Sequence, residues 1–142
     1  KLKIQSYKYK NILIFNVLEH LPAYNLAFSE TYRILKKGGF LIGSTPFLYQ
    51  IHSAPNDYFR YTKDFLKLNL KNNKFKNISI IPLGYGPFIA SYSLIHPYIK
   101  FVPFFSQIIL IVAYMLDSFI QLFVKTKLEE IFPIGYFFIA KK

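Results

Sequence analysis

The chain has 142 residues, enough for one domain with a hydrophobic core. It contains no cysteine, which excludes disulfide bonds, thiolate metal ligands and a cysteine nucleophile. Its 18 basic and 7 acidic residues give a net charge of +11, but the lysines are scattered without a basic stripe or nucleic-acid motif, so we expect no nucleic-acid partner.

The first part of the chain predicts a strand, a helix and a second strand. Asn11–Leu18 is a nearly continuous apolar run, typical of a strand covered on both faces in a parallel sheet. Pro22 suits the first turn of a helix over Ala23–Lys37, and Gly38 suits its left-handed cap. Phe40–Thr45 is the second strand, so the order is the βαβ pattern of a parallel sheet.

Further along, the pattern predicts one more helix and two more strands. Thr62 is placed to cap a helix from Lys63 to about Lys71. Lys76–Leu83 and Ile134–Ala140 have the apolar composition of strands.

Between these two strands lies a long apolar segment, Phe88–Val124. Its part Phe101–Val124 is about long enough to span a bilayer. Polar residues nevertheless recur in it at three- to four-residue steps, at Gln107, Tyr114, Asp117, Ser118, Gln121 and Lys125. Such a stripe favours a buried or lid-like helix, and it leaves open an interfacial or a spanning helix. No amino-terminal signal peptide is visible.

The densest group of polar and aromatic side chains follows the second strand, in the loop Pro46–Thr62, PFLYQIHSAPNDYFRYT. Another polar group, Asn16 to His20, closes the first strand. If the two strands are neighbours, both groups face one crevice, because ligands bind beyond the carboxyl ends of parallel strands. A histidine and a carboxylate there can transfer a proton, and a Tyr/Arg/Asp set can hold a polar substrate.

Three segments carry a family resemblance: NVLEHL, RILKKGGFLIGSTP and IHSAPNDYFRYT. Together they resemble the second half of a class I S-adenosylmethionine (SAM)-dependent methyltransferase, closest to the type 11 group, which includes members near sugar and cell-envelope biosynthesis. PIGYFFIAKK resembles the closing antiparallel strand of that family. The resemblance implies an α/β fold, a partial Rossmann-like doubly wound sheet made of strands 4–7, with an apolar helical insertion before the last strand. Residues 11–83 would be the core, 88–132 the insertion and 133–142 the closing strand.

The resemblance also implies what this chain would lack. The family's glycine-rich loop and its ribose- and adenine-binding residues follow strands that are not present here. Because the chain begins at Lys1 and not at a methionine, we expect a fragment of a SAM-dependent enzyme that is inactive by itself. The parent would methylate a small molecule or a cell-envelope or glycan precursor. It would work in the cytoplasm, and residues 88–124 would allow peripheral contact with the inner membrane surface. The alternative is a non-catalytic membrane-associated or scaffold protein of the same partial fold.

Roles of single residues follow from the same resemblance. Asn16 and Glu19 would border the cofactor, and His20 would orient the substrate or accept a proton. The substrate side would be shaped by His52, Asp57, Tyr58, Arg60 and Tyr61. Other interpretations stay open: His20 as a turn cap, Asp57 and Arg60 as an ion pair that pins the loop, and the tyrosines as packing residues.

Two further expectations concern ions. Glu30 and Arg33 lie off the apolar stripe of their helix and predict a solvated ion pair. The histidines His20, His52 and His96 are far apart in sequence, without H-x-x-x-H spacing, so no metal site is expected.

Overall fold

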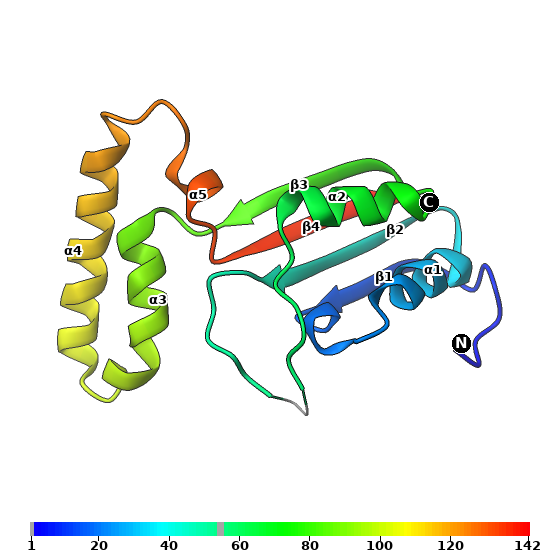
Figure 1. Ribbon diagram of the computed structural model, residues 1–142, viewed down its shortest axis with the longest axis horizontal. Coiled ribbons are helices and arrows are strands. Elements are labelled where there is room, and N and C mark those ends of the chain that lie inside the picture. Colours follow the sequence, from blue (N-terminus) through cyan, green and yellow to red (C-terminus); the bar gives the residue numbers. More distant parts are fainter. Residues whose placement is uncertain (1, 54–55) are drawn as a thin grey trace. The chain divides into compact units, whose positions relative to one another are not determined.

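The computed structural model describes residues 2–53 and 56–142 (Figure 1). Lys1, Ala54 and Pro55 lie outside the described residues, including the proline of the predicted binding loop. The chain forms two compact units. We call residues 1–46, 51–81 and 136–142 the sheet unit, and residues 47–50 and 82–135 the helical unit.

A four-stranded sheet has the order β1-β2-β4-β3. Its strands are β1 (Tyr9–Phe15), β2 (Leu35–Pro46), β3 (Lys76–Leu83) and β4 (Gly135–Lys141). β1 and β2 are parallel neighbours, with Ile12 opposite Leu41. β4 runs antiparallel to β2, as Figure 1 shows, and its end is joined to β2 by the bond from the Lys142 N–H to the Gly39 carbonyl. The expected α/β class and the antiparallel closing strand are therefore confirmed.

The helices of the sheet unit follow the ends of β1 and β2. A 3-10 turn, η1 (Leu18–His20), precedes α1 (Tyr24–Ile34), and α2 (Lys63–Asn72) begins at Thr62, whose hydroxyl accepts the Phe65 N–H at 3.2 Å as predicted. The two α-helices contact each other and lie over the sheet in Figure 1. Between the helices and the sheet lies a core of fully buried side chains that includes Phe28, Leu35, Leu41, Leu66, Leu70 and Phe138.

The predicted helix over Ala23–Lys37 is too long. α1 ends at Ile34, and Gly38, with φ +74°, lies inside β2 and does not cap the helix. Leu35 is fully buried, and the β1–β2 register shifts between Tyr9 and Asn11, so the residues after Leu35 form a bulge that joins the strand pair. Tertiary packing thus overrides the helical pattern here.

The expectation that Glu30 and Arg33 form a solvated pair is wrong. Arg33 donates to both carboxylate oxygens of Glu30, and also to the carbonyls of Leu2 and Ile4 and to the Ser6 hydroxyl. Glu30 is largely buried and accepts the Leu2 N–H at 2.8 Å. The hydrogen bonds from Arg33 are the main reason that the pKa of Glu30 falls to about 2. The pair anchors the amino-terminal segment to α1.

In the helical unit, the apolar segment forms two helices joined by a short turn, and a third short helix follows. These are α3 (Pro87–Ile99), α4 (Pro103–Gln121) and α5 (Leu128–Ile131). Asp117 of α4 is fully buried and accepts the N–H groups of Phe88 and Ile89 at 3.0 and 2.8 Å. A carboxylate at this place satisfies the free amides at the start of α3 and stabilises the helix dipole.

The polar stripe of α4 is used inside this hairpin. The Tyr114 ring stacks on Tyr85 with centroids 4.7 Å apart, and Ser106 hydrogen-bonds Tyr92 at 2.9 Å. Gln121 donates to the Val124 carbonyl. The middle of the stripe, from Tyr114 to Gln121, therefore contacts α3 and the flanking turns, while Gln107 and Lys125 are exposed.

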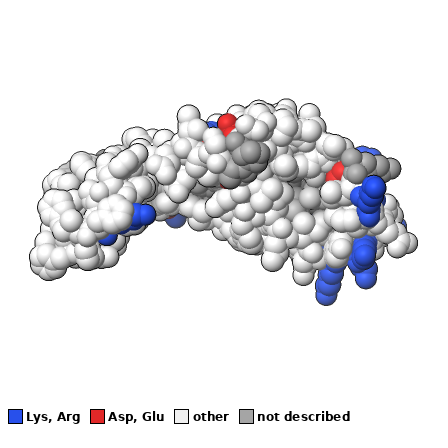
Figure 2. Space-filling view, turned by 90° about the horizontal axis from the view of Figure 1, so that it is seen from below, with Lys and Arg blue, Asp and Glu red and all other residues white. Residues whose placement is uncertain are grey.

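Most of the remaining surface of α4 is apolar and exposed. By length and composition α4 is able to cross a membrane, and only 17% of its apolar window is buried. Large side chains exposed by 57% or more include Phe104, Ile111, Met115 and Phe119. Figure 2 shows the hairpin, on the left, as almost entirely uncharged on that face. The sequence left three alternatives for this segment: a buried or lid-like helix, an interfacial helix or a spanning helix. Within the part of the chain that the structure describes, α4 is not a buried helix.

Candidate functional site

The ends of β1 and β2 are joined by polar contacts. Asn16, directly after β1, has a left-handed backbone with φ +49°, which asparagine tolerates better than most residues. Its N–H donates to the Ser44 carbonyl at 3.0 Å, and the Ser44 hydroxyl donates to Asn16 Oδ1 at 2.9 Å. Sequence reasoning did not single out Ser44; the change from apolar to polar residues at the end of its strand was the available signal.

The turn after β1 holds a buried carboxylate. Glu19 is 0% exposed, and neither of its carboxylate oxygens has a hydrogen-bond partner among the described residues. Burial raises the pKa of Glu19. The Thr45 hydroxyl, at the end of β2, is likewise buried and unpartnered within the described chain. Buried polar groups without partners are rare, and they concentrate at functional sites.

Hydrogen bonds among the described residues bind the loop after β2 to this turn. Glu19 accepts the Tyr58 N–H through its carbonyl at 2.8 Å, and His20 Nδ1 lies 2.6 Å from the Asn56 carbonyl. The Tyr61 hydroxyl donates to the Leu18 carbonyl at 3.0 Å. The structure thus brings the two predicted groups together at the carboxyl edge of the parallel strands.

Asp57 and Arg60 hold the loop in shape. The guanidinium forms a two-pronged contact with the carboxylate, at 2.5 Å to Oδ1 and 2.7 Å to Oδ2. Oδ2 also accepts the His52 N–H at 3.0 Å, and the Asp57 side chain is only 2% exposed. These contacts, above all the hydrogen bonds from Arg60, hold the pKa of Asp57 well below its usual range. Both residues therefore pin the loop, and their contact with substrate stays a prediction.

The aromatic residues of the loop differ in exposure. Tyr61 is 1% exposed and packs among the rings of Tyr24, Phe59 and Phe65. Burial raises the pKa of its phenol. The Tyr61 side chain therefore belongs to the core beneath the loop. Tyr58 is 46% exposed. His20 and His52 pack edge to face with ring centroids 4.9 Å apart, and their side chains are 15% and 33% exposed. Among the predicted site residues, Asn16 and Tyr58 are exposed, and His20, His52 and Arg60 are partly exposed.

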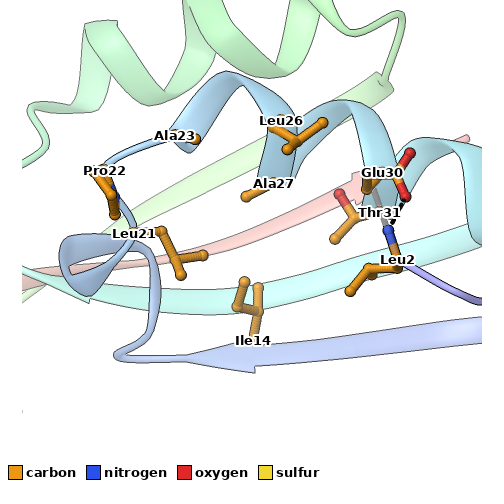
Figure 3. Close-up of a pocket in the computed structure, with 9 residues that line it drawn as sticks. All are labelled: Leu2, Ile14, Leu21, Pro22, Ala23, Leu26, Ala27, Glu30 and Thr31. Carbon is orange, nitrogen blue, oxygen red and sulfur yellow. Dashed lines mark hydrogen bonds between the residues drawn. The ribbon is translucent and has the colours of Figure 1, made fainter.

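A cavity of about 330 Å³ lies elsewhere in the sheet unit and contains none of the predicted site residues. Figure 3 shows apolar side chains of β1 and α1, among them Ile14, Leu26 and Ala27, facing this space. Its one acidic residue, Glu30, is already bonded to Leu2 and Arg33. The cavity suits an apolar side chain better than a polar substrate.

The fold was compared with solved structures. Haemonchus contortus phosphoethanolamine N-methyltransferase 2, in complex with S-adenosyl-L-methionine, is similar with a TM-score of 0.59 and 15% identity, covering 99% of this chain and 34% of that one. A SAM-dependent methyltransferase from Archaeoglobus fulgidus gives a TM-score of 0.59 and 16% identity over 98% of this chain and 62% of that one. A possible histamine N-methyltransferase from Thermotoga maritima gives 0.61 and 14% over 100% and 60%.

These likenesses show that the chain has the mixed α/β fold of SAM-dependent methyltransferases. The chain spans from about one third to three fifths of the length of these three proteins. A scan against models of known families found no match, and neither did a search of curated protein sequences.

Proposed function

We propose that this chain, which has the fold of class I SAM-dependent methyltransferases, is part of such an enzyme and supplies the substrate side of its site. The observation that carries the proposal is the joining of two strand ends: the turn of Glu19 and His20 is hydrogen-bonded to the loop that contains Asn56 and Tyr58. In α/β sheets, ligands bind at this kind of edge.

The sheet itself supports a longer protein. β1 is at one edge of the four strands, although its sequence is typical of a strand covered on both faces in a parallel sheet. Leu13 and Phe15 on it are 64% and 49% exposed. Apolar edge strands are usually covered or paired in native proteins. We propose that further strands of the parent pair with β1 and bring the glycine-rich cofactor loop.

In this proposal, Asn16 and Glu19 face the cofactor. The buried carboxylate of Glu19 has no donor among the described residues, so it suits a ligand that carries donors or positive charge, and SAM carries both. When bound, SAM supplies a methyl group on a positively charged sulfur. What this chain adds is alignment of the acceptor with that methyl group.

The acceptor would lie against the exposed side chains of the loop. His20 is held by the Asn56 carbonyl and is placed to orient an acceptor or take its proton, and His52 and Tyr58 offer further polar contacts. Asp57 and Arg60 keep these groups in place. Such a rim of imidazole and phenol groups suits a small polar molecule or a glycan precursor.

The proposal is tested by cofactor binding. We expect the 142-residue chain alone to show no measurable heat with S-adenosylhomocysteine in calorimetry, because a glycine-rich cofactor loop is not in its sequence. The protein encoded by the complete reading frame should bind it in the micromolar range. A complete reading frame without a strand followed by an acidic, glycine-rich turn, and without such binding, would refute the proposal.

A second candidate function rests on the helical unit. A 19-residue helix with an exposed apolar face is unusual for a surface that contacts only water. We propose that α4 lies in a membrane interface with its polar stripe against α3, whether the chain belongs to an enzyme or to a non-catalytic scaffold protein.

Flotation with liposomes tests this placement. We expect the chain to float with the vesicles and Met115→Asp to reduce the bound fraction several-fold, because the charge would have to enter the apolar layer. Leu68→Asp, at a position of α2 that is 55% exposed against 63% for Met115, is the control and should float like the unaltered chain. Equal flotation of both variants would contradict contact through α4.

A further inference from the structure

The turn after β1 and the loop after β2 bring together two imidazoles and a carboxylate. Glu19, His20 and His52 each offer one ligand atom, and these three atoms all lie within 4.8 Å of one another. His20 Nε2 is 3.8 Å from Glu19 Oε1. Sequence spacing had given no hint of this cluster, since His20 and His52 are separated by 31 residues.

The carboxylate in the cluster has no other use in the described chain. The Glu19 side chain is completely buried, and both its oxygens are without hydrogen-bond donors among the described residues. A buried carboxylate without hydrogen-bond donors is unfavourable, because its charge has lost the water that would solvate it. A metal ion between Glu19 and the imidazoles would remove this cost.

The orientation of His20 suits a ligand. Its Nδ1 lies 2.6 Å from the Asn56 carbonyl oxygen. A carbonyl only accepts, so Nδ1 carries the hydrogen, and neutral His20 presents a lone pair on Nε2, toward Glu19. This is the outer-sphere arrangement that orients metal-binding histidines in other proteins. Asp57 Oδ2, 3.4 Å from His52 Nδ1, is a comparable partner for the second imidazole.

We propose that Glu19, His20 and His52 bind one divalent first-row transition-metal ion at the carboxyl edge of β1 and β2. Two imidazoles and one carboxylate are a ligand set for zinc and its neighbours, with at least one coordination position left for water or a substrate oxygen. Ligands 2.1 Å from a tetrahedral ion are about 3.4 Å apart, so the 3.8 Å contact needs little closure. The site does not rest on the proposed methyl transfer, because only residues of this chain form it. A metal bound here would replace the roles proposed above for Glu19 at the cofactor and for His20 at the acceptor.

Calorimetry with zinc tests the site. The full chain, freed of metals with a chelator and held in a non-ionic detergent, should bind Zn²⁺ saturably with one ion per chain and should give no heat with Mg²⁺. His52→Asn should weaken Zn²⁺ binding at least about tenfold, because even the loss of an outer-shell partner of a ligand costs about that much. His96→Asn is the matched control, because His96 lies on α3 in the helical unit and should leave the affinity unchanged.

A second readout keeps the proposal testable if His52→Asn fails to fold. Co²⁺ added to the unaltered chain should produce a visible absorption band that differs from that of aqueous Co²⁺, and Zn²⁺ should abolish the band. An unchanged aqueous Co²⁺ spectrum, absence of saturable Zn²⁺ binding, or equal weakening by His52→Asn and His96→Asn would overturn the proposal.

Discussion

Gly43→Ala is expected to destabilise the sheet unit by about 3 kcal/mol or more. A Cβ atom at Gly43 would lie 2.4 Å from the Ile14 carbonyl oxygen and 2.5 Å from Cζ of Phe138. The first contact is with backbone of β1, which is unable to move without loss of its pairing with β2. The second contact is with the Phe138 ring of β4, which is fully buried. Neither neighbour is therefore able to move aside without a loss of packing or of strand pairing.

Urea denaturation followed by circular dichroism measures this effect. Lys36→Ala, on an exposed position of the same strand, is the control and should change the free energy of unfolding by less than about 0.5 kcal/mol. If Gly43→Ala were as stable as Lys36→Ala, β1 and β2 would not approach each other as closely as the structure requires, and the shared edge would be lost.

Asp57→Asn is expected to destabilise the chain by about 2–3 kcal/mol at neutral pH, somewhat below the cost of breaking a fully buried ion pair because Arg60 is partly exposed. The substitution removes the charge that holds Arg60 while keeping the size of the side chain. The His52 N–H keeps a possible acceptor, so the measured loss reports mainly the ion pair.

The effect of Asp57→Asn should depend on pH. The pKa of Asp57 is lower in the folded than in the unfolded chain, so its ionisation stabilises the fold above the unfolded value near pH 4. That contribution is lost as the pH falls through the folded pKa, and the difference between Asp57→Asn and the unaltered chain should shrink in acid. Asp64→Asn, at an exposed position of α2, is the control and should change the free energy of unfolding by less than about 1 kcal/mol at neutral pH. A pH-independent loss would mean that the Asp57 charge is not the stabilising feature.

Strand and helix positions in the sheet unit were largely predictable because local signals and packing agree. The cap at Thr62 and the strand Lys76–Leu83 are observed as predicted. The predicted strand Asn11–Leu18 overlaps β1, but β1 ends at Phe15 and Leu18 belongs to η1. The end of α1 was not predictable, because Lys36 and Lys37 favour a helix end while burial of Leu35 begins the strand. The role of Arg33 depends on residues 2–6, which are distant in sequence.

The neighbourhood of the site followed from topology, whereas its chemistry did not. Parallel strands place their carboxyl ends together, so the meeting of the His20 turn with the Asp57 loop was predictable. The burial of Tyr61 and the unpartnered state of Glu19 depend on how the loop folds back, and periodicity does not encode this. The exposed apolar face of α4 was not predictable either. The spacing of polar residues along α4 does not tell whether a single helix or a whole sheet packs against the helix.

The distance between the two imidazole rings of His20 and His52 tests most directly whether the strand ends form one crevice. The chain has three histidines, so single substitutions assign every imidazole resonance in an NMR spectrum. With ring centroids 4.9 Å apart, a nuclear Overhauser effect between the His20 and His52 ring protons is predicted. Assigned rings that show effects to other neighbours but none to each other would contradict the shared crevice and the site built on it.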